Sequence, residues 1–576
     1  MVKQANVQIS PWRFRIVVGG LLLLAFLLAW RTLTLQVLDV DRGYQFLQGQ
    51  GNARTNRTEV IPAHRGIISD RNGEPLAVST PVASIWANPQ ELQNAKGDWA
   101  KLAGALDMST SELSRRVERY RESQFMYLRR HVAPAAAQAL MQMKIPGVYL
   151  QREYRRFYPA GEVTAHILGF TDVDDRGQEG LELTYDEWLN GTPGRKRVLK
   201  DLYGNIIREI DAGEAASPGK DVQLSIDLRL QYLAYRELKA AINRTGAKAG
   251  SVVIIDSETG EVLALVNQPS FNPNNRSQLS PDALRNRAVI DMFEPGSTVK
   301  PLTMVAALES GKYQPDTQIN TNPGYIKVGP KVLEDHRNYG VITVAEVLKK
   351  SSQVGTTKIA LSLDEHDVWG VFDRFGLGRT TSSGFPGESN GMLPNRPNWR
   401  AIERATFAFG YGITTTNLQL AQAYSVFANR GVFQQVTMLK RTEKATQQQV
   451  ISAKIARQIV DMLEEVTELG GTATRAQVDA YRIAGKTGTS HKAVAGGYAE
   501  DRYFSIFAGV APASNPRIVA VVTIDEPKGD YFGGLVAAPV FSKVVSDALR
   551  LLNIAPDNIE AAEPKPKIKT KGDAAA

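Results

Sequence analysis

The sequence contains no cysteine among its 576 residues, and it has only six histidines. Without cysteine the chain can form no disulfide, no thiolate-bound zinc or iron–sulfur centre, and no cysteine nucleophile. The histidines show neither an HExxH motif nor another paired spacing of metal ligands, so we expect no metal site.

The sequence also has only a small excess of positive over negative charge. Lysine and arginine number 68 against 60 aspartate and glutamate, a net charge of +8, and most basic residues are spread along the chain. The one dense basic cluster lies in 558–576, a stretch rich in proline and alanine that we expect to be a disordered tail. We therefore expect no nucleic-acid partner. A hydrophobic content of 43% predicts large cores.

Long apolar runs are absent except at 16–38. At about 1.5 Å per residue, these 23 residues would form a helix of about 34 Å, long enough to cross a bilayer. A signal peptide is the alternative, but no small-x-small cleavage site follows, which favours an uncleaved anchor. Lys3, Arg13 and Arg15 precede the run, so the positive-inside rule predicts that 1–15 is cytoplasmic and that everything after residue 38 lies outside.

Arg31 falls within the predicted membrane helix. Its side chain could extend toward the membrane surface, or it could contact a helix of a partner protein. We favour the first interpretation.

The remaining chain predicts two domains of α+β character. A first domain at 39–220 mixes short strands with amphipathic helices, and the polar segment 212–220 reads as a linker to a second domain at 221–557. Strand-like runs at both ends of the second domain, such as 251–256 and 517–524, predict one sheet. Helical patterns fill the middle: 301–310, 344–350, 417–428 and 452–469.

A serine-x-x-lysine pair occurs twice, at Ser217–Lys220 and at Ser297–Lys300. The first contains proline and glycine and lies in the predicted linker. The second follows the turn residues 294–296 and precedes an apolar helical run, which places Ser297 near a helix N-terminus and Lys300 one turn further. A desolvated lysine there can act as the base for a serine hydroxyl. The simpler alternative is an N-cap serine with an exposed lysine.

Three other segments resemble known motifs. Gly387–Gly391 matches Gly-x-Ser-x-Gly, but the prolines around it indicate a loop rather than a strand–helix elbow. Gly485–Thr487 lacks the earlier glycine of a phosphate-binding loop. Lys486–Thr489 (Lys-Thr-Gly-Thr) fits an edge strand, in which Gly488 would allow a peptide backbone to approach. The alternative for that segment is a surface turn.

Ser-x-x-Lys, a central serine motif and Lys-Thr-Gly occur here in the order that resembles penicillin-binding proteins and serine β-lactamases. Further motifs resemble class B penicillin-binding proteins of the division-specific type: Arg65–Gly73, Arg156–Gly161, Gly177–Glu182, Phe293–Pro301, Phe385–Glu388, Phe409–Gly412 and Ala484–Thr489. The resemblance implies a single-pass membrane anchor, an α/β pedestal module, and a transpeptidase domain with an antiparallel sheet flanked by helices.

The resemblance also implies roles for individual residues. Ser297 would be the acylated nucleophile, Lys300 its base, and Ser351 a proton shuttle. The terminal carboxylate of a D-Ala-D-Ala stem peptide would bind Lys486, Thr487 and Thr489. The remaining residues expected to contact the substrate are Gln353, Gly488 and Tyr411, with the loop 531–534 beside them.

The implied activity is a serine-type peptidoglycan D,D-transpeptidase of septal wall synthesis, which β-lactams inhibit and which needs no cofactor. Implied partners are a SEDS-family glycan polymerase and other division proteins of the cytoplasmic (inner) membrane, with the catalytic domain in the periplasm. Because the family motif Ser-x-Asn reads Ser351-Ser352-Gln353 here, a β-lactam-binding scaffold or sensor with impaired turnover is an alternative. A β-lactamase or carboxypeptidase is another, although the long pedestal module argues against it.

Overall fold

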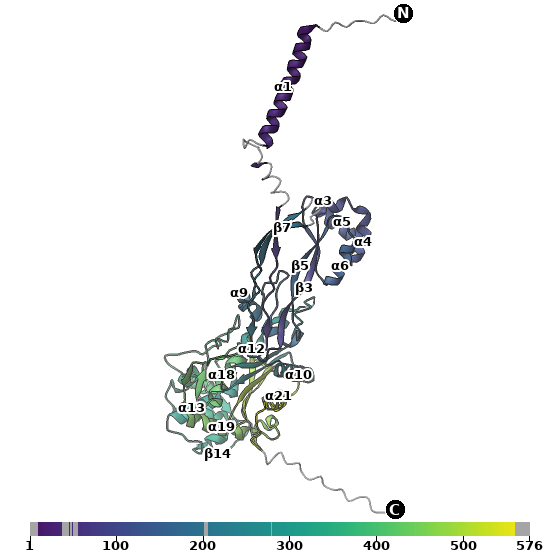
Figure 1. The fold of residues 1–576 in the computed structure, drawn as a ribbon. Helices are drawn as coiled ribbons and strands as arrows, with labels where there is room; N and C mark the ends of the chain where they lie inside the picture. Colours follow the sequence, from purple (N-terminus) through teal and green to yellow (C-terminus); the bar gives the residue numbers. More distant parts are fainter. Residues whose placement is uncertain are drawn as a thin grey trace, which may run out of the picture. The chain divides into compact units, whose positions relative to one another are not determined.

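The computed structural model describes residues 10–36, 45–46, 49, 56–200, 206–277, 279–443 and 445–558. The chain forms two compact units, one made of Met1–His64 and Gly191–Gly219, the other of Arg65–Asn190 and Lys220–Ala576 (Figure 1). The basic tail expected at 558–576 lies, apart from its first residue, outside the described residues.

The first unit contains a long helix and a small sheet. Helix α1 (Pro11–Gln36) is long and apolar enough to cross a membrane, and it begins five residues before the predicted span. Strands β1 (Asn56–Ile61), β6 (Gly194–Lys200) and β7 (Ile206–Glu214) form an antiparallel sheet in the order β1-β6-β7. Strand β7 runs into the segment expected to be a linker, because its pairing with β6 stabilises an extended polar sequence.

The second unit begins with a region that we call the pedestal region, residues 65–190. Its long strand β3 pairs with β4 and β5 on opposite sides, and helices α3 to α6 share an apolar core with that sheet. Its elements are β2 (Ile68–Ser69), β3 (Pro75–Ala87), α3 (Pro89–Gln93), α4 (Trp99–Ala105), α5 (Thr110–Arg119), β4 (Met126–Val132), α6 (Pro134–Gln142), β5 (Val148–Phe157), α7 (Ala165–Leu168), α8 (Gly180–Thr184) and α9 (Asp186–Leu189). Strand β8 (Val222–Gln223) pairs with β2 in parallel.

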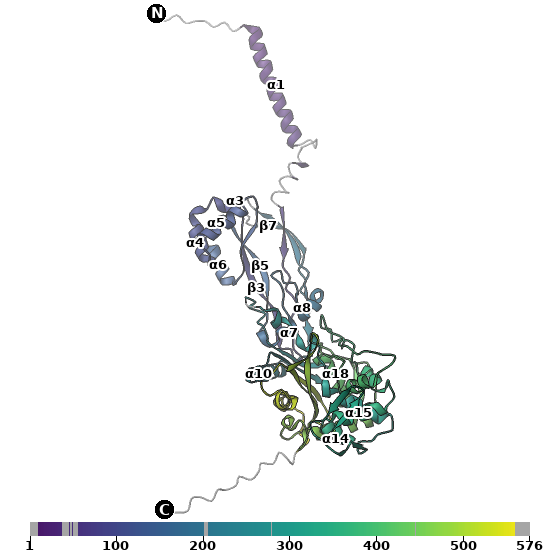
Figure 2. The same ribbon diagram turned by 180° about the vertical axis from the view of Figure 1, so that it is seen from behind.

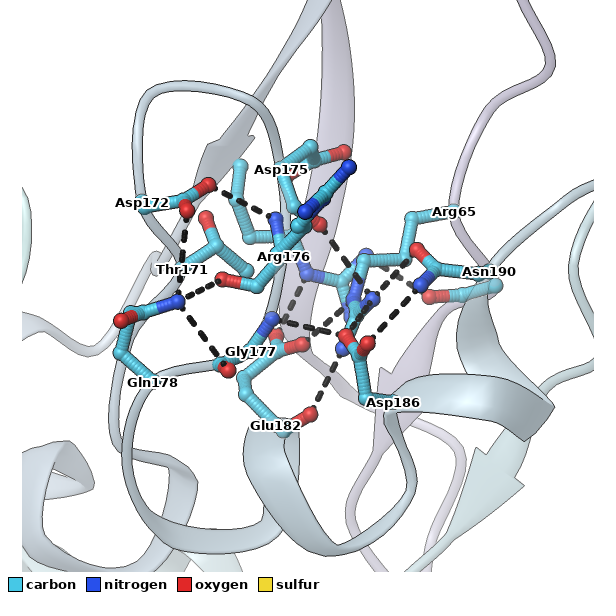
Figure 3. Close-up of polar contacts among 12 residues, drawn as sticks. Arg65, Thr171, Asp172, Asp175, Arg176, Gly177, Gln178, Glu182, Asp186 and Asn190 are labelled. Carbon is cyan, nitrogen blue, oxygen red and sulfur yellow. Dashed lines mark hydrogen bonds and ion pairs between the residues drawn. The ribbon is translucent and has the colours of Figure 1, made fainter.

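A buried ionic network joins the three sequence motifs of the pedestal region, and Figure 3 shows the part of it around Arg65 and Glu182. Arg65 Nε donates to Glu182 Oε2 at 2.6 Å, and its Nη1 donates to Asp186 at 2.7 Å and to Asn190 at 2.6 Å. Arg156 Nε donates to the other oxygen of Glu182, also at 2.6 Å. The Glu182 side chain is 0% exposed, so it neutralises two buried guanidinium groups at once.

Residues 220–558 form a five-stranded antiparallel sheet with helices on both faces. The strand order is β10-β9-β19-β18-β17, with β9 (Ala249–Asp256), β10 (Val262–Gln268), β17 (Ala484–Val494), β18 (Gly497–Ala511) and β19 (Ile518–Asp525). In Figure 1, α10 (Leu228–Thr245) and α21 (Ala538–Leu551) lie on one face, and α13 (Lys300–Glu309), α18 (Asn417–Ala428) and α19 (Ala453–Thr467) lie on the other. Figure 2 shows the same arrangement from behind.

The smaller elements surround this sandwich. They are α11 (Pro281–Leu284), α12 (Arg287–Ile290), β11 (Gln318–Asn320), β12 (Tyr325–Val328), β13 (Lys331–Glu334), β14 (Val341–Thr343), α14 (Val344–Lys349), α15 (Gln353–Ser362), α16 (Asp367–Arg374), α17 (Ala401–Phe407), β15 (Val432–Gln434), β16 (Gln447–Gln449) and α20 (Gly533–Val536). Single 3-10 turns are η1 (Lys96–Asp98), η2 (Gly161–Val163), η3 (Gly296–Val299) and η4 (Thr474–Ala476).

The predicted α+β architecture is confirmed. The sheet combines strands from both ends of the region, and all four predicted central helices are present as α13, α14, α18 and α19. Helix α18 is buried along its whole length, and its polar side chains Asn417, Gln419, Gln422 and Ser425 are hydrogen-bonded there.

Candidate functional site: a serine–lysine cleft

Ser297 lies in the 3-10 turn η3, directly before helix α13, whose first residue is Lys300. The turn is held from several directions. Thr298 Oγ1 donates to the Pro295 carbonyl at 2.7 Å, and Tyr424 of α18 donates its hydroxyl to the Thr298 carbonyl at 2.7 Å. A Cβ at Gly410 would lie 2.3 Å from the Gly296 carbonyl oxygen, so only glycine allows the Phe409–Gly412 motif to approach this turn.

Both lysines of the sequence motifs converge on Ser351. Lys300 Nζ donates to the Ser351 carbonyl at 2.6 Å and contacts its Oγ at 3.3 Å. Lys486 Nζ donates to Ser351 Oγ at 2.9 Å. Ser351 has a φ of 56°, an uncommon conformation for serine that turns its side chain toward both ammonium groups. The Ser297 hydroxyl makes no hydrogen bond to the described residues and lines the adjoining cleft.

Burial makes these two lysines chemically unusual. Both side chains are 0% exposed. Burial lowers the pKa of Lys300 to about 7, although the Asp335 carboxylate opposes that shift. Burial also lowers the pKa of Lys486, and the nearby charge of Lys300 lowers it further. At neutral pH a substantial fraction of Lys300 is therefore uncharged and able to accept a proton.

Asp335 supports this cluster, and no sequence motif indicated it. Its carboxylate accepts hydrogen bonds from Ser352 Oγ at 2.6 Å and from the backbone N–H groups of Gln353 at 2.6 Å and Val354 at 3.1 Å. It thereby caps helix α15 and fixes the turn that carries Ser351. Its role depends on a contact across 17 residues, which local sequence patterns do not reveal.

The Lys-Thr-Gly segment forms part of the edge strand β17, as predicted. A Cβ at Gly488 would lie 2.7 Å from the Thr298 side chain and 2.9 Å from the Pro295 carbonyl oxygen. Glycine is thus needed here for close packing of β17 on the Ser297 turn, a reason that the sequence did not suggest. Thr487 Oγ1 lies 3.0 Å from Thr472 Oγ1.

A cleft of about 540 Å³ opens above these groups. Six of the nine residues predicted for the site line it, whereas Lys300, Lys486 and Gly488 lie beneath or behind its surface. The lining residues are Ser297, Glu334, Asp335, His336, Tyr339, Ser351, Gln353, Tyr411, Thr472, Thr487, Thr489, His491, Tyr503, Tyr531, Phe532, Gly533, Gly534 and Leu535. The loop 531–534, which was predicted to lie beside the site, contributes Tyr531 and Phe532 to this lining. His336, which was not predicted as a site residue, packs edge-on against Phe532 with 5.9 Å between the ring centroids.

Two family models match the chain. The penicillin-binding protein transpeptidase domain matches residues 250–546, and the penicillin-binding protein dimerisation domain matches residues 60–224.

Curated relatives match along nearly the whole length. The chain is 42% identical to the peptidoglycan D,D-transpeptidase FtsI of Escherichia coli, over 99% of this chain and 97% of that protein. It is also 42% identical to the probable peptidoglycan D,D-transpeptidase PbpC of Pseudomonas aeruginosa, over 95% of this chain and 97% of the relative.

Solved structures agree. Penicillin-binding protein 3 of Mycobacterium tuberculosis in complex with aztreonam is 28% identical, with a TM-score of 0.68 over 86% of this chain and 98% of that one. The transpeptidase domain of Burkholderia pseudomallei penicillin-binding protein 3 is 42% identical, with a TM-score of 0.54 over 58% of this chain and 97% of that one.

Proposed function

The chain belongs to the class B penicillin-binding proteins of the division-specific type, and from this premise we propose that it is a peptidoglycan D,D-transpeptidase of septal wall synthesis. The observation that carries the proposal is the convergence of Lys300 and Lys486 on Ser351 beside the open hydroxyl of Ser297. A serine, a partly neutral lysine and a bridging hydroxyl are what two-step acyl transfer requires.

In the first step Ser297 Oγ attacks the carbonyl of the penultimate D-alanine. Lys300, whose pKa is about 7, takes the hydroxyl proton. The terminal D-alanine leaves as an amine, and Ser351 passes a proton to it, since its Oγ lies within reach of both ammonium groups. The product is an ester between the donor peptide and Ser297.

The donor's terminal carboxylate would bind at strand β17. Thr487 and Thr489 line the cleft there, and Lys486 lies beneath them. The backbone N–H groups of Ser297 and Thr489 would stabilise the oxyanion, and each such donor contributes about 3 kcal/mol in comparable sites. Gln353 and Tyr411, which also line the cleft, would contact the peptide, and Gly488 keeps the strand close to the Ser297 turn.

In the second step a neighbouring stem-peptide amine attacks the ester and displaces Ser297. β-Lactams would acylate the same serine, because their strained amide takes the place of the D-Ala-D-Ala bond. We assign this chemistry to residues 221–557.

We assign residues 39–220, which include the pedestal region, as a non-catalytic module that docks a SEDS-family glycan polymerase and other division proteins. The length and apolar character of α1, with Arg13 and Arg15 near its start, support a single-pass anchor with a cytoplasmic N-terminus and a periplasmic catalytic domain.

Intact mass spectrometry with a fluorescent penicillin tests the proposal. We expect a stable adduct on the wild-type protein, no adduct on Ser297→Ala, and release of D-alanine from a D-Ala-D-Ala donor peptide. An adduct lost within minutes would identify a β-lactamase instead. A stable adduct without any turnover of the donor would favour the scaffold or sensor.

A further inference from the structure

The charges that face the cleft are opposite in sign to those beneath it. Its lining includes two carboxylates, Glu334 and Asp335, but no lysine or arginine. The two catalytic-motif lysines are fully buried under the floor. A substrate group that enters the cleft therefore meets negative charge at one wall before it reaches Lys486.

The two carboxylates differ in what they already bind. Asp335 accepts three hydrogen bonds from the start of α15. Glu334, the last residue of β13, has an exposed side chain that makes no hydrogen bond or ion pair to the described residues. Lys331 and Arg337 lie three residues to either side in sequence; neither forms an ion pair with Glu334, and Arg337 lies over the ring of Tyr339 at 5.5 Å. Glu334 is thus held on a strand with its charge unpaired.

The backbone around Glu334 is well fixed. Strand β13 pairs with β12 through Tyr325 and Glu334, and the Asp335 N–H donates to the Gly324 carbonyl at 2.9 Å. Because Asp335 is also bonded to α15, the Glu334 backbone is tied to the element that carries Ser351 and Gln353. This wall is formed by β13 and α15, whereas the proposed donor carboxylate site is formed by β17.

We propose that Glu334 is a specificity-determining residue that recognises a positively charged group of the acceptor. The inference rests on the proposed transpeptidase function and names the class of its second substrate. A carboxylate at this wall repels the anionic end of the donor and attracts an amine, which is protonated in water at neutral pH. Glu334 thereby favours a cationic amine over a neutral acceptor of the same length.

With this assignment, each proton and bond in the transfer of the acyl group from Ser297 to the acceptor amine is accounted for. Glu334 holds one cationic group of the acceptor, and the attacking amine is a second group, which first releases one proton to solvent. The neutral amine nitrogen then bonds to the ester carbonyl carbon, and the bond from that carbon to Ser297 Oγ breaks. The second amine proton passes through Ser351 and Lys300 to the departing Ser297 Oγ, which restores the free serine.

Competition between two matched acceptors tests the proposal. The full-length protein is acylated with a D-Ala thioester donor in the presence of equal concentrations of D-lysine and D-norleucine, which differ by one terminal ammonium group. Mass spectrometry then gives the ratio of the two amide products. Because both acceptors compete for one acyl-enzyme, the ratio does not depend on how fast each variant is acylated.

We expect the wild-type protein to prefer D-lysine, and Glu334→Gln to reduce that preference about fivefold, as expected for one exposed ion pair. Glu334→Lys should reduce it further. Salt of about 1 M, where the Debye length is about 3 Å, should lower the preference in the wild type but not in Glu334→Gln. Asp316→Asn neutralises an exposed acid that does not line the cleft and is the matched control.

An unchanged product ratio in both Glu334 variants would overturn the inference, as would an equal change in Asp316→Asn. Failure of the proposed function itself looks different, because the wild-type protein would then form neither amide product.

Discussion

The pedestal region and the catalytic cleft both bury positive charge, but with opposite consequences. Arg65 is buried, which alone would lower its pKa, yet ion pairs with Glu182 and Asp186 raise that pKa above its usual value. Lys300 and Lys486 are equally buried, but their closest polar partner is the neutral Ser351, and their pKa values fall. A paired buried cation fixes a structure, whereas an unpaired one becomes a base.

Replacement of Lys300 should produce the largest effect, because it removes the proposed base. We expect Lys300→Met, which keeps the length of the side chain, to slow acylation by penicillin about a thousandfold, within the range of general-base contributions. Stopped-flow measurement of adduct formation checks this value. Lys312→Met, an exposed change after the same helix, is the control. A loss below tenfold would mean that another group takes the proton.

Loss of the Glu182 carboxylate, which Arg65 and Arg156 share, should destabilise the pedestal region. Glu182→Gln keeps the shape but leaves Arg65 with one ion pair among the described residues, to the partly exposed Asp186, and removes the ion pair of Arg156. We expect a loss of about 3 kcal/mol in the free energy of unfolding. Chemical denaturation measures it. Glu118→Gln, in an exposed pair with Arg121, should change stability by less than about 1 kcal/mol.

The pH dependence of the acylation rate should distinguish the buried lysine of the cleft from the buried arginine of the pedestal region without any mutation. Lys300 acts in its neutral form, so the acylation rate should fall about tenfold for each pH unit below its pKa of about 7 and level off above it. Arg65, whose pKa is raised by its ion pairs, stays charged throughout. Measurements of adduct formation between pH 5.5 and 8.5 test this profile, and a rate independent of pH in that range would contradict the assignment of Lys300 as the base.

The smallest effect is expected at Gln353, whose side chain lines the cleft in place of the family asparagine. Asparagine would retract the amide by about one bond length, and displacements of that size change rates measurably. We expect Gln353→Asn to speed acylation by β-lactams about fivefold. Identical rates and drug affinities in the two proteins would show that the extra methylene has no effect on the site.

Local sequence patterns predicted most helices and strands of the catalytic region, but they did not predict where every strand in the molecule begins and ends. Helix α18 begins at Asn417 and ends at Ala428, as its residues predict, because the Thr416 capping box and a mostly apolar sequence are local signals. The last three residues of β7, 212–214, were expected to belong to a linker, because their small and polar side chains become a strand only by pairing with β6. Asp335 and His336 were missed since their partners are distant in sequence.

The sequence by itself determined the chemistry that this protein can use: serine and lysine motifs in a fixed order, no cysteine, and one apolar helix. Only the tertiary structure decided how reactive those groups are. The pKa of Lys300 depends on its complete burial, on Asp335 and on its contact with Ser351, which the chain brings together from three separate segments. Burial and charge proximity are properties of packing, and no local pattern of residues encodes them.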